Sequence, residues 1–264
     1  MRFRMQRELF LHILNDVKAY DDYFIQQKKD ATSRLGLSSI QKTTIVVRIL
    51  AFGYAADHYD EYIKIGESTT IKCLKAFCNA IVAVYAKEYM RPPNEANIAR
   101  LLEEGKQKRF SGILGSIDCM HWEWKNCLLE WHGTHRGRSG KNTLILKAIP
   151  SQDLWIWHAF FGMPGSHNDI NVLDHSPVFN GIINGQLPPT IPHPTTGKEK
   201  LFAQRQEVCR KNVEQAFEVL QIKWAITQRP MRYWEKNDLR LIMKTCIILH
   251  NMIIEDERHA KVGR

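Results

Sequence analysis

The sequence contains no Cys-x-x-Cys pair and no Cys/His spacing typical of a zinc site, although it has six cysteines. We therefore expect reduced thiols in an intracellular protein. The sequence also lacks an apolar run of the ~20 residues that cross a bilayer. Its first apolar stretch, MRFRMQRELFLHIL, carries several charges and so does not resemble a secretory signal. We expect no membrane partner.

The charge balance is basic, and the composition is that of an ordinary globular protein. The 264 residues include 37 Lys and Arg against 28 Asp and Glu, a net charge of +9. Such a balance favours polyanionic partners such as nucleic acid. Charge alone, however, favours the simpler interpretation of a basic globule without such a partner.

Residues 1–109 carry helical patterns and predict an all-α N-terminal domain. A helix that begins at serine caps ends at Gly53, and another over 67–89 places apolar residues three and four apart. Ser68 is the expected N-cap of the second helix. With a short amphipathic element that ends at Gly66 between them, these helices have, over 38–86, the layout of a helix-turn-helix unit with a preceding helix. In that interpretation Thr69, Thr70 and Lys72 contact DNA; a purely structural bundle is the slightly favoured alternative.

From residue 110 the periodicity changes to that of strands. Segments 110–124, 142–150 and 153–162 are rich in aromatic, Ile and Leu residues, and a Ser-Gln-Asp junction between the last two predicts a hairpin. A short helix over 168–183, a Pro-rich loop over 184–200 and two long helices follow. This order predicts an α/β domain over 110–257, with a tail at 258–264. A carboxylate on the first strand is the layout of RNase H-like nucleases.

Three carboxylates are candidates for metal-dependent phosphodiester chemistry, because Mg²⁺ and Mn²⁺ prefer oxygen ligands. Asp118 lies within an apolar strand pattern, where an unpaired charge is expensive. Asp169 follows the segment FFGMPGSHN and has an equally weighted alternative role as a helix cap. Glu214 lies between Val213 and Phe217 on a largely apolar helix, and its alternative is an ordinary surface glutamate.

The segment WHGTHRGRSGK, residues 131–141, is rich in glycine and basic residues. Its cations, Arg136, Arg138 and Lys141, suit contacts with a phosphate backbone. The alternative is a solvated hairpin loop. His132 and His135 also suggest metal ligation, but no further ligands complete a site.

Several long motifs together resemble one family. They are FSGILGSIDCMHWEWKNC, WHGTHRGRSGK, DLWIWHAFFGMPGSHNDINVL, RQEVCRKNVEQAFEVLQ and CIILHNMIIEDE. The chain resembles, over about residues 8–257, the PIF/Harbinger transposases and the nucleases derived from them, particularly plant members. The resemblance implies an RNase H-like DDE domain, cleavage and strand transfer of DNA with divalent metal (Mg²⁺ or Mn²⁺), a nuclear location and a Myb-like DNA-binding partner. It also implies that Asp118, Asp169 and Glu214 bind the metal.

The chain departs from the family pattern in two places. Family members carry another strand before the glutamate helix, and its aspartate is the second carboxylate of the DDE triad. Here that region is the segment 184–200, which contains no aspartate, so we expect a sheet that lacks one strand and impaired catalysis. Gln221 also replaces a lysine that often follows the glutamate, whereas Arg210 matches the arginine of that signature. The alternative function is a non-catalytic DNA- or protein-binding relic of a transposase.

Overall fold

The computed structural model describes residues 4–27, 35–53, 65–107, 117–167, 211 and 214–262. The chain divides into two compact units: Met1–Arg91 with Val219–Arg264, and Pro92–Glu218. The boundary at 218/219 falls inside a helical stretch, 214–223. These units are defined by which residues pack together. The domain limits expected from the sequence stay a prediction.

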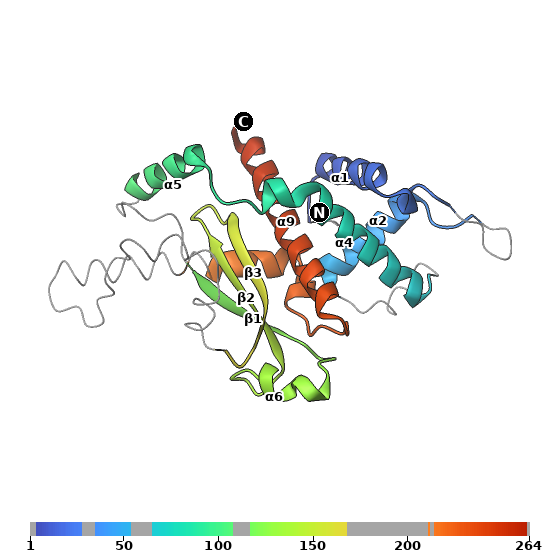
Figure 1. The fold of residues 1–264 in the computed structure, drawn as a ribbon. Coiled ribbons are helices and arrows are strands. Elements are labelled where there is room, and N and C mark those ends of the chain that lie inside the picture. The colour runs from blue at the N-terminus through green and yellow to red at the C-terminus, as the bar shows by residue number, and fades with distance from the viewer. Residues whose placement is uncertain are drawn as a thin grey trace. The chain divides into compact units, whose positions relative to one another are not determined.

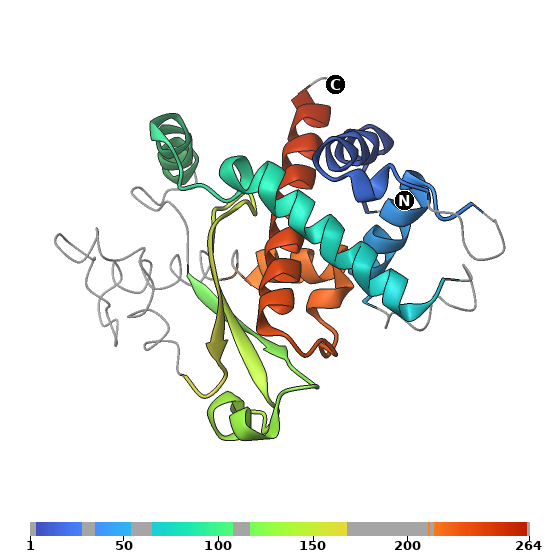
Figure 2. The ribbon, with the colours of Figure 1, turned by 45° about the vertical axis from the view of Figure 1, so that its right-hand side comes forward.

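The first unit is helical. Its helices are α1 (Arg7–Tyr20), α2 (Ser39–Phe52), α4 (Glu67–Tyr89) and α9 (Lys236–Val262), with short 3₁₀ turns η1 (Asp22–Phe24) and η5 (Ala225–Thr227). Figures 1 and 2 show α4 crossing α9, with α1 and α2 packed beside α4. The helical patterns of the sequence are thus confirmed for the described residues of this unit.

Both ends of α2 follow from local sequence. The Ser38 hydroxyl accepts from the Gln41 amide, and the Gln41 side chain accepts from the Ser38 amide, which forms a capping box. Gly53 ends the helix with φ of 64°, a conformation that glycine adopts without steric penalty. A Cβ at Gly53 would also lie 2.9 Å from the carbonyl oxygen of Ala225, so the position excludes larger residues.

Helix α4 is a core helix of the first unit. Its buried side is lined by Leu74, Phe77, Cys78 and Ile81. By length and composition alone α4 is able to cross a membrane, a test that buried core helices of soluble proteins also pass. The expectation that the sequence lacks a segment long and apolar enough to cross a bilayer is thus wrong for 67–89. Its predicted N-cap is wrong: the helix begins at Glu67 after Gly66, and Ser68 lies within it.

Helix α9 fills the centre of the same unit. Every residue from Thr245 to Ile254 is buried. Asn251 donates to the carbonyl oxygen of Tyr89 at 2.8 Å, and the Thr245 hydroxyl donates to that of Cys78 at 3.4 Å. These contacts join the C-terminal helix to α4 through residues that are more than 150 positions apart in the chain.

The second unit contains a three-stranded antiparallel sheet in the order β1-β2-β3, so the described chain as a whole is mixed α/β. The strands are β1 (Asp118–Glu123), β2 (Thr143–Pro150) and β3 (Ile156–Pro164). This confirms the three predicted strands and the hairpin between the last two. The register pairs Asp118 with Ala148 and Trp122 with Leu144. Trp122 packs against Phe161 of β3, with ring centroids 5.7 Å apart.

Two short elements join β1 to β2, and a helix precedes the sheet. The connection holds η3 (Leu129–Trp131) and α6 (His132–His135), which lies at one end of the sheet in Figure 1. Helix α5 (Glu95–Gln107) is fixed to the β2–β3 turn because Arg100 contacts Asp153 at 2.8 Å. The predicted helix at 168–183 and the Pro-rich segment 184–200 lie outside the described residues.

Candidate functional site

Asp118 is the first residue of β1 and is half-buried. Its Oδ1 accepts a hydrogen bond from the Cys119 amide at 2.8 Å. Alternation along the strand places Asp118 on the same face as Met120 and Trp122, which are both buried. The predicted strand carboxylate is therefore confirmed in position, at the strand's end rather than in its middle.

The opposite face of the sheet carries a buried lysine. Lys147 pairs across the ladder with Cys119, so it lies on the face that Asp118 does not occupy. Burial lowers the pKa of Lys147, because water no longer stabilises its charged form. Burial likewise lowers the pKa of His158, and the Lys147 charge lowers it further. Lys147 is thus buried on the face of the sheet opposite Asp118 and is not part of the candidate carboxylate site.

The structure describes one further member of the predicted carboxylate set. Glu214 lies in the described helical stretch 214–223 and is exposed, while Ala216 and Phe217 on that stretch are buried. Asp169 lies outside the described residues. Within the described ranges no three His, Cys, Asp or Glu side chains gather closely enough to hold a metal ion.

The two histidines of the β1–β2 connection have structural roles. His135 is buried, and its ring packs against Trp124 and Trp131 with centroid distances of 5.6 and 5.9 Å. Its Nδ1 lies 3.0 Å from the Trp131 carbonyl oxygen. His132 Nε2 lies 3.1 Å from the Cys127 carbonyl oxygen. Both histidines therefore order the connection, and the alternative of metal ligation gains no support.

Beyond this aromatic cluster the chain forms a tight basic turn. The Gly137 amide donates to the backbone carbonyl oxygen of Lys141 at 2.8 Å, and Gly140 has φ of 74°. Arg136, Arg138 and Lys141 are all exposed. Lys141 contacts Glu123 of β1 at 2.7 Å, which compensates its charge, so the two arginines carry most of the positive field of this turn.

The helix residues expected to meet DNA differ in exposure. Thr69 and Lys72 are exposed on the first turns of α4. Thr70 is fully buried, and its hydroxyl donates to the Gly66 carbonyl oxygen at 3.3 Å. Lys72 lies over the ring of Tyr23, with Nζ 5.1 Å from the ring centroid. Of the three, only Thr69 and Lys72 are exposed and accessible to a partner. The connection from α2 to α4 lies outside the described residues.

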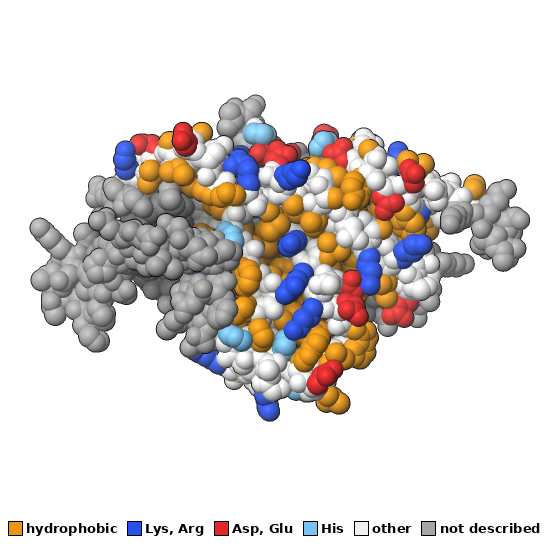
Figure 3. Space-filling view, in the orientation of Figure 1, with side chains coloured by type: hydrophobic (Ala, Val, Ile, Leu, Met, Phe, Trp, Pro, Cys, Tyr) orange, Lys and Arg blue, Asp and Glu red, His pale blue; other side chains and the backbone are white. Residues whose placement is uncertain are grey.

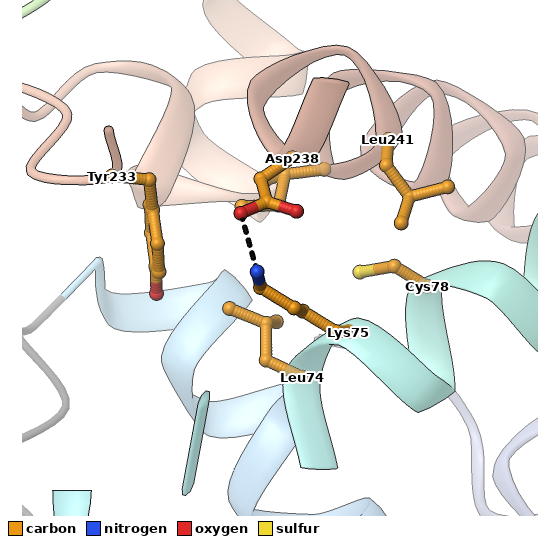
Figure 4. A pocket seen from close by; sticks show the side chains of 7 residues that line it. Leu74, Lys75, Cys78, Tyr233, Asp238 and Leu241 are labelled. Carbon is orange, nitrogen blue, oxygen red and sulfur yellow. Dashed lines mark ion pairs between the residues drawn. The ribbon is translucent and has the colours of Figure 1, made fainter. Parts of the chain in front are cut away.

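A small hollow lies between α4 and the start of α9 (Figure 4). Its walls include Leu74, Cys78 and Leu241, and an ion pair joins Lys75 to Asp238 at 2.7 Å. The hollow has a volume of about 10 Å³, enough for one water molecule. It therefore offers no room for an organic substrate.

Comparison with known proteins gives one family. The family model described as "Plant transposon protein" matches residues 87–192 and 186–261. Together these segments cover about two thirds of the chain, and they contain the predicted carboxylates Asp118, Asp169 and Glu214. The two segments meet at 186–192, inside the region where the sequence predicts a missing strand. No curated protein and no solved structure matches the chain.

Proposed function

Because the chain belongs to the plant transposon protein family, it is related to transposases, and we propose that it is a DDE nuclease-like protein that acts on DNA. The observation that carries the proposal is the family match over the stretch that holds Asp118 and Glu214. The antiparallel order β1-β2-β3, with the first carboxylate on an outer strand of the described sheet, agrees with an RNase H-like domain of the PIF/Harbinger type.

Asp118, Asp169 and Glu214 are the residues that would hold a divalent cation. Their oxygen donors fit Mg²⁺ or Mn²⁺. Such an ion, when bound, polarises a phosphodiester and lowers the pKa of an attacking water or hydroxyl group. Asp118 uses Oδ1 to accept from the Cys119 amide, which fixes the carboxylate at the strand end. The described residues contribute two of the three carboxylates.

We expect catalysis to be impaired. The segment 184–200 lacks the aspartate that family members carry on an additional strand. The division of the family match at 186–192 supports a discontinuity at this point. A site with fewer carboxylates binds cations more weakly, because each carboxylate contributes both a ligand and a compensating charge.

Arg136 and Arg138 are the proposed phosphate contacts, since both are exposed on a tight turn beside the end of β1 that lies opposite Asp118. A nuclear location and a Myb-like partner that supplies sequence recognition complete the proposal. Thr69 and Lys72 of α4 remain proposed DNA contacts, whereas the buried Thr70 serves the helix start.

Cation binding tests the proposed site without relying on activity. If Kd for Mn²⁺ is on the order of 1 mM, 10 mM Mn²⁺ stabilises the folded chain by about 1.4 kcal/mol. That corresponds to a rise in Tm of about 2–4 °C. Asp118→Ala should abolish this rise, and Glu103→Ala, at an exposed acid on α5, should preserve it. Equal stabilisation of all three proteins, or of none, would remove the metal-dependent proposal.

The alternative is a non-catalytic DNA-binding relic, favoured by the position of the exposed Arg136 and Arg138 at the end of β1 opposite Asp118. It predicts DNA binding that weakens with salt and survives Asp118→Ala. A plot of log K against log[salt] decides, because each phosphate contact contributes about −0.9 to the slope on duplex DNA. A slope near zero would remove DNA as the partner.

A further inference from the structure

The segment that leads into α9 exposes a large aromatic side chain. Trp234 lies two residues before the helix and is 62% exposed. A single exposed apolar residue is ordinary on a protein surface. Trp234 differs because of the cations that follow it along the chain.

Lys236, Arg240 and Lys244 recur every four residues on α9, so they lie along one side of the helix. Arg240 and Lys244 are exposed, and neither has an ion-pair partner among the described residues. Like charges four residues apart destabilise an isolated helix. The spacing therefore carries an electrostatic cost for helix formation, which an anionic partner would offset.

An acidic residue beside this row is already paired. Asp238 lies on the neighbouring side of α9 and contacts Lys75 of α4 at 2.7 Å, as Figure 4 shows. That carboxylate therefore does not pair with Arg240 or Lys244. Figure 3 shows Lys and Arg side chains gathered in the region of α4 and α9, with apolar side chains between them.

The chemistry of this surface fits single-stranded DNA. An exposed indole offers a face on which an unpaired base stacks, whereas bases within a duplex keep their faces covered. The row from Lys236 to Lys244 spans about 12 Å along the helix. This length is sufficient for several phosphates of one strand. The adjoining hollow holds about one water molecule and excludes a small organic ligand.

We propose that Trp234 with Lys236, Arg240 and Lys244 forms a binding surface for single-stranded DNA, separate from the carboxylate site. A base stacks on Trp234 and the cations contact the phosphates that follow. This inference takes from the proposed function only that the partner is DNA.

Fluorescence anisotropy of a labelled dT12 oligonucleotide with the full chain tests the surface. The measurement is made in EDTA, so a failure of the metal-dependent proposal does not affect it. We expect Trp234→Ala to weaken binding about tenfold, and Trp234→Phe to retain most of it. The double variant R240Q/K244Q should make the slope of log K against log[salt] shallower by about 1.4, at about 0.7 per phosphate contact on a single strand.

Two controls match these changes in type. Tyr20→Ala removes another exposed aromatic residue, and Lys87→Gln removes another exposed cation, on α4. Both should leave dT12 binding unchanged, and thermal unfolding should show that every variant is folded. Unchanged dT12 binding in folded Trp234→Ala would overturn the proposal. Tighter binding to a 12-base-pair duplex than to dT12 would overturn it as well.

Discussion

Gly165 is the residue at which the end of β3 meets the β1–β2 connection. A Cβ at this position would overlap the Thr143 hydroxyl and lie 2.7 Å from the His135 carbonyl oxygen. We predict that Gly165→Ala lowers the free energy of unfolding by about 1–3 kcal/mol, because both neighbours belong to the packed sheet end. Gly133→Ala is the matched control, since nothing lies within 4 Å of its Cβ. Denaturant unfolding of the two variants measures the difference in the free energy of unfolding. Equal values would show that the end of the sheet rearranges to accommodate the added methyl group.

Asp256 on α9 makes stability depend on pH. Its buried Oδ2 has no hydrogen-bond partner among the described residues. Burial raises the pKa of this carboxyl group, and Glu8 and Glu257 raise it further. The folded state thus favours the protonated acid. The stability that this preference contributes is present at low pH and is lost as pH rises through the raised pKa.

We therefore predict that Asp256→Asn raises Tm at pH 7, and that the gain shrinks as pH falls through the raised pKa toward about 4, because the parent carboxyl group becomes protonated over that interval. Glu103→Gln serves as the comparison, because it removes an exposed ion pair to Lys106 and should change stability by at most about 1 kcal/mol. Thermal unfolding from pH 4 to pH 8 provides the measurement. A gain that is constant over this range would contradict the assignment to Asp256 ionisation.

At the residue level the sequence located Asp118 on a strand, because apolar and aromatic residues around it predict extended structure. It did not locate the start of the strand, and β1 begins at Asp118 itself. Strand periodicity identifies faces but not ends, which depend on hydrogen bonds to β2. The sequence likewise did not single out Trp234, whose exposure depends on tertiary packing. The four-residue spacing of the cations that follow Trp234 was the feature of the sequence that could have indicated this surface.

At the level of elements, the capping box of α2 is a local feature whose removal has a predictable cost. Ser38→Ala should lower the free energy of unfolding by about 1 kcal/mol, since the Gln41 amide loses its acceptor. Ser39→Ala, one residue later and inside the helix, should be close to neutral. Chemical denaturation compares the two. A larger loss for Ser39→Ala would mean that the cap is elsewhere.

The cap of α4 shows why such features are only partly predictable. Ser38 and Ser68 both precede apolar helical patterns, yet only Ser38 caps its helix. Glu67, Ser68 and Thr69 are all polar and exposed, so the sequence offers no unique start. The burial of Thr70 depends on how α4 packs, which local spacing does not report.

At the scale of the whole molecule, the first unit is assembled from both ends of the chain. Local periodicity predicted α4 and α9 as helices but not their contact, because 146 residues separate the end of one from the start of the other. The three strands of the second unit were predictable because each carries its own run of aromatic, Ile and Leu residues. The match of the family model to 87–261 agrees with the resemblance in the sequence, at the coarser level of plant transposon proteins.

Removal of α9 tests this assembly. Deletion of residues 236–264 should unfold the helices of 4–91, because α9 supplies core residues such as Leu239, Met243 and Ile247. Far-ultraviolet circular dichroism should show a loss of helix well beyond the deleted residues. A loss equal to the deleted helix alone would mean that α1, α2 and α4 form a stable core by themselves.

The central claim is that the chain is a transposase-related DNA-binding protein with an impaired DDE site. Cleavage of supercoiled plasmid in 10 mM Mg²⁺ or Mn²⁺, by the full chain and by Asp118→Ala, tests it most directly. We predict that both proteins bind the plasmid and that neither cuts it above the rate of a protein-free control. Robust cutting by the full chain that disappears in Asp118→Ala would contradict the claim and restore a complete nuclease site.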